Sequence, residues 1–152
     1  MSTVDERRIK LQEINASIDG VRTAPERMPD RLSDSMLPCA ITYPGPAVHR
    51  LAAVGYRRET RSYVVRLYVR SFASGKDTDQ NFQACLPFLE SVPKKYLSTD
   101  VIAPSTQEWE LLSFVDTDSD GGVGVIPLHG TPEGPLYWGI VFEVELTYKE
   151  TL

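Results

Sequence analysis

The sequence has few of the side chains that carry most metal and redox chemistry. It holds two cysteines and two histidines among 152 residues. Cys39 and Cys85 lie far apart and outside any C-x-x-C pair, which argues against a zinc site or a redox pair, so we expect two small buried apolar residues. Neither His49 nor His129 has a partner at the spacing that a catalytic motif demands, and we expect both to lie on the surface or in turns.

Long apolar runs are also missing, so nothing in the sequence is suited to span a bilayer. The stretch Met1 to Arg8 has no apolar signal-peptide core, and we expect the protein to stay in the cytoplasm where it is made. No G-x-G-x-x-G, Walker loop or H-E-x-x-H is present. We therefore expect no enzyme, and we assign no catalytic, cofactor-binding or metal-binding residue.

One short motif resembles a metal site. Asp116-x-Asp118-x-Asp120-Gly121 copies the first half of a calcium loop, in which alternate carboxylates and a glycine wrap one ion. The closing position holds Pro127 instead of a bidentate glutamate, and the flanking residues have the pattern of strands. We favour an acidic hairpin turn, with calcium binding as the lesser alternative.

The length and composition are those of one globular domain, residues 1–152, with 41% hydrophobic residues to build a core. Charge is unevenly placed within the net charge of −5: residues 1–76 hold 13 basic and 8 acidic residues, whereas residues 77–152 hold 3 and 13. Such asymmetry is typical of a basic surface with an acidic tail, or of a subunit with two complementary sides. The second half is patterned and apolar enough to fold, which disfavours a tail.

The clearest strand pattern lies between Arg61 and Phe72. Side chains alternate across a strand, so one side here is apolar and the other is striped with arginine. We interpret the apolar side as packed against helix, and the other side as wet or in contact with another subunit. The apolar side comprises Tyr63, Val65, Leu67 and Val69, and the other comprises Ser62, Val64, Arg66, Tyr68 and Arg70.

Two helices are expected. Thr3-Val4-Asp5-Glu6 matches a capping box and predicts a helix over about residues 4–19. Asp77 or Thr78 caps a second helix, in which Pro87 predicts a kink or a delayed start. Between the first helix and the sheet, the segment from Val21 to Leu37 is rich in Pro, Arg, Asp and Ser. It predicts a long extended connector that crosses one end of the domain and is a candidate contact arm.

The remaining strands are shorter. The one before Pro44-Gly45-Pro46 should end there, because proline cannot continue a ladder. The next strand should turn at Arg57 to Thr60 into the strand described above, which makes a hairpin with a basic tip. This order of elements predicts an α+β fold, a mostly antiparallel β-sheet with two helices packed on one face. The additional strands are expected at Leu37–Tyr43, Ala47–Tyr56, Trp109–Val115, Val123–Ile126 and Tyr137–Tyr148.

The arginines of this hairpin are the candidate interface residues. More charge gathers there than a solvated sheet face requires, and acidic residues alternate along the wet side of the last strand. The hairpin arginines, with Arg50 among them, and the nearby tyrosines could instead follow a phosphate backbone, although a chain of pI near 5.0 lacks the usual charge of a nucleic-acid-binding domain. We favour contact between subunits through Arg57, Arg58, Arg61, Arg66, Arg70, Glu143 and Glu145.

Several stretches, taken in order, resemble the tail terminator (tail completion) proteins of long-tailed bacteriophages. The resemblance rests on packing and turn residues over most of the chain, not on a reactive signature. The stretches that carry the resemblance are Ile18-Asp19-Gly20-Val21, Leu37-Pro38-Cys39-Ala40-Ile41, Tyr43-Pro44-Gly45-Pro46, Tyr63 to Val69, Phe82 to Tyr96, Val123-Gly124-Val125 and Tyr137-Trp138-Gly139-Ile140-Val141-Phe142.

The resemblance implies a virion protein without enzymatic activity. Proteins of this family form a ring, typically a hexamer, that caps the tail tube and joins it to the neck and head, so the tail tube and neck proteins would be its partners and DNA would pass through it. The alternative is another neck or minor tail protein. The charge pattern agrees with a ring, because a closed ring needs one patch that meets a different patch on the next copy.

Overall fold

The computed structural model describes residues 3–73, 75–98, 109–117 and 122–151. Within these residues, two α-helices, two short 3-10 helices and five strands follow one another. They are α1 (Val4–Ala16), η1 (Asp34–Met36), β1 (Cys39–Ala53), β2 (Tyr56–Ser71), α2 (Thr78–Tyr96), β3 (Trp109–Thr117), β4 (Val123–Pro127), η2 (Leu128–Gly130) and β5 (Leu136–Thr151).

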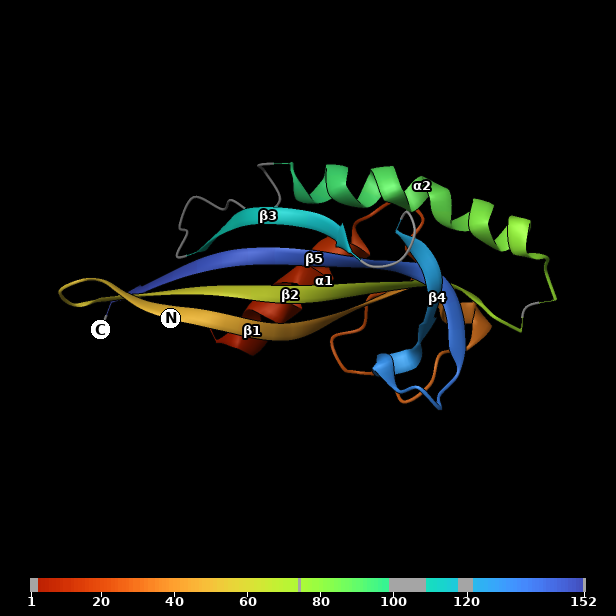
Figure 1. Ribbon diagram of the computed structural model, residues 1–152, viewed down its shortest axis with the longest axis horizontal. Coiled ribbons are helices and arrows are strands. Elements are labelled where there is room, and N and C mark those ends of the chain that lie inside the picture. Colours follow the sequence, from red (N-terminus) through yellow and green to blue (C-terminus); the bar gives the residue numbers. More distant parts are fainter. Residues whose placement is uncertain (1–2, 74, 99–108, 118–121, 152) are drawn as a thin grey trace.

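The strands form one antiparallel sheet in the order β1-β2-β5-β3, and β4 pairs with β5 beyond the end of β3. Both helices pack on one face of this sheet, so the α+β fold predicted from the sequence is confirmed. Figure 1 shows β1, β2 and β5 running along the long axis, with the β1–β2 hairpin tip at one end and β4 with η2 at the other. No described helix is both long and apolar enough to cross a membrane.

Local signals set the helix starts, as predicted. The Thr3 hydroxyl accepts from the amide of Glu6 at 3.1 Å, while the Glu6 carboxylate accepts from the amide of Thr3 at 3.0 Å. Asp77 and Gln80 make the same reciprocal pair at the start of α2. These bonds satisfy amides that have no partner within the helix. The first helix ends at Ala16, earlier than predicted, and α2 continues through Pro87 to Tyr96.

The helix-facing side of the sheet carries the main core. Tyr63, Val65 and Leu67 are buried there, as their alternation predicts, and they pack with Phe88 and other residues of α2. Every second residue of β5 from Ile140 to Tyr148 is buried as well. At about 25 cal/mol per Å² of apolar surface removed from water, this layer supplies the main stabilisation of the fold.

A smaller second core covers the opposite side of the sheet at the end far from the hairpin tip. The connector reaches across this end, as predicted, and its Leu32 and Leu37 are buried with Tyr68 and Tyr137. His129 of η2 contacts both the connector and the sheet: its Nε2 contacts the Pro29 carbonyl, and its Nδ1 lies 2.6 Å from the hydroxyl of Tyr43 on β1. Toward the hairpin tip, the described residues leave this side open, with Val48, Arg50 and Arg58 exposed.

Two predictions about β1 and its turn are wrong. The strand does not end at Pro44-Gly45-Pro46; it continues to Ala53, and a shift of register between Pro44 and Ala47 accommodates the two prolines. This is possible because β1 is an edge strand, where a missing N–H interrupts no further ladder.

The hairpin also turns earlier than predicted. It turns at Val54-Gly55, where Gly55 has a φ of +84° that favours glycine, and Arg57 to Thr60 lie within β2. The tip itself is therefore apolar, with Val54 97% exposed, and the arginines stand on the strands behind it.

Candidate subunit interface: the open sheet face

Three cations form a row across the open side of the sheet. Arg50 of β1 lies opposite Arg58 of β2, and Arg58 lies opposite Lys149 of β5. All three side chains are exposed. Like charges directly opposite each other on neighbouring strands destabilise a sheet. We call Arg50, Arg58 and Lys149 the cationic row.

Two carboxylates stand further along the same side. In the register of β2 and β5, Ser62 lies opposite Glu145 and Val64 opposite Glu143. The Ser62 hydroxyl donates to Glu143 at 2.9 Å, and both carboxylates are half-exposed, as predicted for the wet side of the last strand. Lys149 and Glu145 are four residues apart on one strand, about 13 Å at the usual rise. The open face is therefore positive near the hairpin tip and negative toward its centre.

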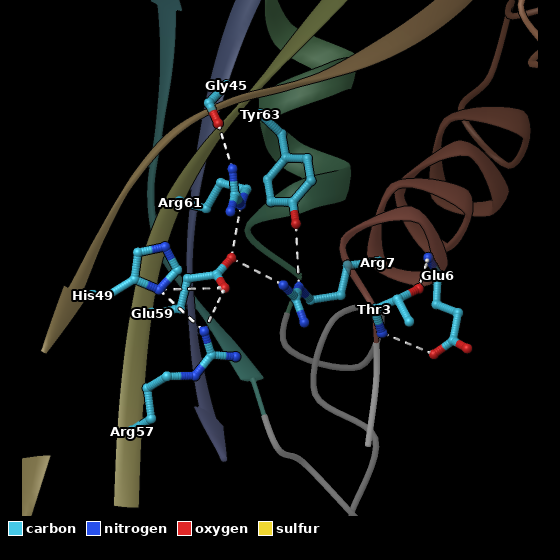
Figure 2. Close-up of polar contacts among 9 residues, drawn as sticks. All are labelled: Thr3, Glu6, Arg7, Gly45, His49, Arg57, Glu59, Arg61 and Tyr63. Atoms are coloured by element: carbon cyan, nitrogen blue, oxygen red, sulfur yellow. Dashed lines mark hydrogen bonds and ion pairs between the residues drawn. The ribbon is translucent and has the colours of Figure 1, made fainter. Parts of the chain in front are cut away.

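The helix-facing side of the same hairpin is organised around one buried carboxylate (Figure 2). Glu59 is 3% exposed and accepts from Arg7 of α1 at 3.0 Å and from Arg61 at 2.7 Å, both through Oε1. Its Oε2 lies 3.7 Å from Arg57 and 3.9 Å from His49. This Glu59 cluster joins the first helix to the outer part of the hairpin.

The partners of Glu59 are held in turn by the fold. Arg7, itself 3% exposed, donates from Nε to the Tyr63 hydroxyl at 3.2 Å and stacks 4.2 Å from the ring centre of Tyr148. Arg61 also donates to the Gly45 carbonyl at 2.8 Å, in the irregular part of β1. The cluster therefore ties together α1 and three neighbouring strands.

Electrostatics favour the ionised form of Glu59. Burial by itself would raise the pKa of this carboxyl, but the hydrogen bond from Arg61 and the charges of Arg7 and Arg61 outweigh it, and the pKa lies below its ordinary value. A buried pair of this kind is strongly destabilised when one member is removed, because the other charge keeps its desolvation penalty. We conclude that this cluster has an internal, structural role.

The structure separates the arginines that the sequence had grouped. Arg57 and Arg61 point to the helix-facing side and are engaged by Glu59. Arg58 points to the open face, as part of the cationic row. Arg66 also lies on that side, but its guanidinium stacks 4.7 Å from the ring centre of Tyr43 and is half-buried.

Arg70 does not share a side with Arg66, contrary to the simple alternation predicted from the sequence. The register of β2 and β5 shifts between Tyr68 and Arg70, so one extra residue of β2 has no partner on β5. Such a bulge turns the following side chain to a new direction. Arg70 consequently lies beside Ala84 and Phe88 of α2.

Three residues of the Glu59 cluster and the cationic row were not found from the sequence: Arg7, Glu59 and Lys149. Glu59 and Arg7 are 52 positions apart, and no local pattern connects them. Lys149 could have been found only from the pairing of β2 with β5, which places it opposite Arg58. Of the seven predicted interface residues, three remain together on the open face with solvent access and no ion pair to a described residue: Arg58, Glu143 and Glu145.

Comparison with known proteins provides no assignment: no protein-family description matches this sequence, and no curated protein matches it. Within the described ranges, no three His, Cys, Asp or Glu side chains gather so that they could hold a metal ion. The predicted aspartate turn falls largely outside those ranges, since 118–121 are not described.

Proposed function

We propose that this chain is a structural subunit of a bacteriophage tail, of the tail terminator type, and that its copies assemble into a ring at the end of the tail tube. The observation that carries the proposal is the bipolar open face, on which the cationic row stands on the same surface as Glu143 and Glu145. The resemblance in sequence is the reason for proposing this family. The open face is the surface through which copies would contact one another.

The face suits contact between copies because each end complements the other. The cationic row of one copy can lie against Glu143 and Glu145 of the next, which relieves the repulsion within the row. The two patches differ, so such a contact is heterologous and closes into a ring if the rotation between copies permits. Exposed Val48 and Tyr56 near the row add apolar area, with exposed fractions of 53% and 43%.

The test is assembly of the purified protein, followed by analytical ultracentrifugation and negative-stain imaging. We expect closed rings at low salt, and we expect Arg58→Glu with Lys149→Glu to leave a folded monomer. Adding Glu143→Lys with Glu145→Lys should restore assembly in part. The matched control is Arg27→Glu with Lys94→Glu, which changes net charge equally at exposed positions off this face. Assembly of the first variant like the parent would contradict the proposal.

A second candidate function is nucleic-acid binding by the cationic row, since three aligned cations on one surface can follow a phosphate backbone. The carboxylates on the same face disfavour it. A gel shift with duplex DNA at low salt separates the two candidates: retardation that Arg58→Glu abolishes, without ring formation by the parent, would favour nucleic-acid binding. Another neck or minor tail protein would assemble as proposed here but fail to bind isolated tail tubes.

A further inference from the structure

A cavity of about 480 Å³ opens near the end of β2, far from the hairpin tip. Residues of four segments line it: the connector with η1, the end of β2, the residues before α2, and α2 itself. Among its apolar lining residues, Leu37, Val69 and Phe88 are buried. The lining includes Arg22, Asp34, Leu37, Val69, Arg70, Lys76 and Phe88.

The bulge in β2 aims Arg70 into this cavity. It depends on Gly139 of β5, because a Cβ at that position would lie 2.0 Å from the carbonyl oxygen of Leu67. Arg70 lines this cavity together with Ala84 and Phe88 of α2. Bulges of this kind occur next to functional sites, where they redirect a side chain.

The Arg70 side chain has no hydrogen bond or ion pair with any residue that the structure describes, although the residue is half-buried. Beside it, Arg22 makes one long hydrogen bond, 3.4 Å to the Ser35 carbonyl. A half-buried guanidinium with neither carboxylate nor carbonyl partner gives up hydration that an anion would replace. The cavity therefore offers unused hydrogen-bond donors.

The charge of the cavity indicates which anion fits. Three cations, Arg22, Arg70 and Lys76, line it with one carboxylate, Asp34. The nearby Asp77 carboxylate is engaged as the cap of α2, 2.7 Å from the Gln80 amide, and Asp79 lies in an adjoining hollow. The cations that line the cavity outnumber its one lining carboxylate, which favours an anion, and a phosphate monoester carries about −1.5 to −2 at neutral pH. Arginine binds such groups through two parallel hydrogen bonds.

We propose that this cavity binds a phosphate monoester attached to a small apolar group. Arg70 and Arg22 contact the phosphate oxygens, Lys76 adds a further positive charge, and the apolar group packs against Phe88. Its volume lies within the usual range of small-ligand sites, about 300–1,000 Å³. The site is separate from the open face, so it does not depend on the proposed ring.

The test is calorimetric titration of the full chain with phenyl phosphate, a monoester with an apolar ring, and with dimethyl phosphate, a diester of single charge. We expect phenyl phosphate to bind and dimethyl phosphate to bind at least about tenfold more weakly. Arg70→Gln should weaken phenyl phosphate binding by about tenfold or more, as expected for loss of a charged hydrogen-bonded partner. Arg22→Gln, at an exposed position, provides a second variant if Arg70→Gln folds poorly.

The matched control is Arg50→Gln, which removes an exposed arginine at the other end of the sheet and should leave binding unchanged. The inference is overturned if phenyl phosphate gives no binding at millimolar concentration, or if neither Arg70→Gln nor Arg22→Gln weakens it. Equal binding of the diester also overturns it. A short oligonucleotide with and without a 5′-phosphate separates the two sources: tighter binding than phenyl phosphate, dependent on the 5′-phosphate, identifies a nucleic-acid end, and weaker binding identifies a free small monoester.

Discussion

The two sides of the β1–β2 hairpin use arginine in opposite ways. On the helix-facing side, Arg57 and Arg61 surround the buried Glu59, together with Arg7 from α1. On the open side, Arg58 lies between Arg50 and Lys149, with no carboxylate of the described residues within ion-pair distance. Adjacent residues of β2 thus belong to two different sets: Arg57 to the buried Glu59 cluster and Arg58 to the exposed cationic row.

This difference suggests how to distinguish arginines that stabilise the fold from arginines that are available to bind a partner. An arginine whose charge is compensated within the chain stabilises the fold and contributes little to recognition. A row of like charges that the chain leaves uncompensated weakens the isolated fold slightly, and a partner can recover that loss. We infer that the helix-facing arginines stabilise the fold, whereas the role proposed for the cationic row is contact between copies.

The largest expected loss of stability comes from removing the Glu59 carboxylate at the centre of the Glu59 cluster. Glu59→Ala leaves the buried Arg7 without its carboxylate, and we expect a loss of about 3–5 kcal/mol in the free energy of unfolding. Urea denaturation at neutral pH measures it. Glu143→Ala is the matched control on the open side, and its loss should stay within about 1 kcal/mol. Equal losses for the two variants would show that the two sides do not differ.

The contribution of the Glu59 cluster to stability should decrease in acid. The pKa of Glu59 is lower in the folded chain than its ordinary value, so the unfolded chain takes up this proton first as pH falls. The stability that Glu59 contributes is therefore complete above its unfolded pKa, about 4.3, and is lost as pH drops through the folded value. Urea denaturation of the parent and Glu59→Gln should give a gap in stability that narrows below about pH 4. A gap that widens in acid would contradict the assignment.

Sequence reasoning reached the parts of this fold that local signals decide. The two capping boxes begin α1 and α2, and the alternation from Ile140 to Tyr148 identifies the buried strand β5. It placed the hairpin turn wrongly, because Pro44-Gly45-Pro46 and the polar run after Tyr56 gave stronger turn signals than Gly55 between apolar neighbours.

The candidate site was harder to predict because it depends on register. Alternation alone separates Arg58 from Arg57 and Arg61, but only the pairing of three strands brings Arg50, Arg58 and Lys149 into one row. The bulge that redirects Arg70 had one local sign, Gly139 within an otherwise continuous strand pattern. Its consequence for Arg70 requires knowledge that β5 lies beside β2.

The smallest expected effect tests the comparison most directly, because the same substitution should change the free energy of unfolding in opposite directions on the two sides of β2. Arg58→Thr removes the central charge of the cationic row and introduces a residue that favours strands, so we expect the isolated chain to gain about 0.2–1 kcal/mol in the free energy of unfolding. Arg61→Thr makes the same change of residue on the other side of the strand, where it removes a 2.7 Å hydrogen bond to Glu59, and should lose stability instead. Urea denaturation at low salt, where assembly is excluded by dilution, measures both, and added salt should diminish the gain from Arg58→Thr because it screens exposed charges. If Arg58→Thr destabilises the chain as Arg61→Thr does, the cationic row also stabilises the fold. The distinction between the Glu59 cluster and the cationic row is then wrong.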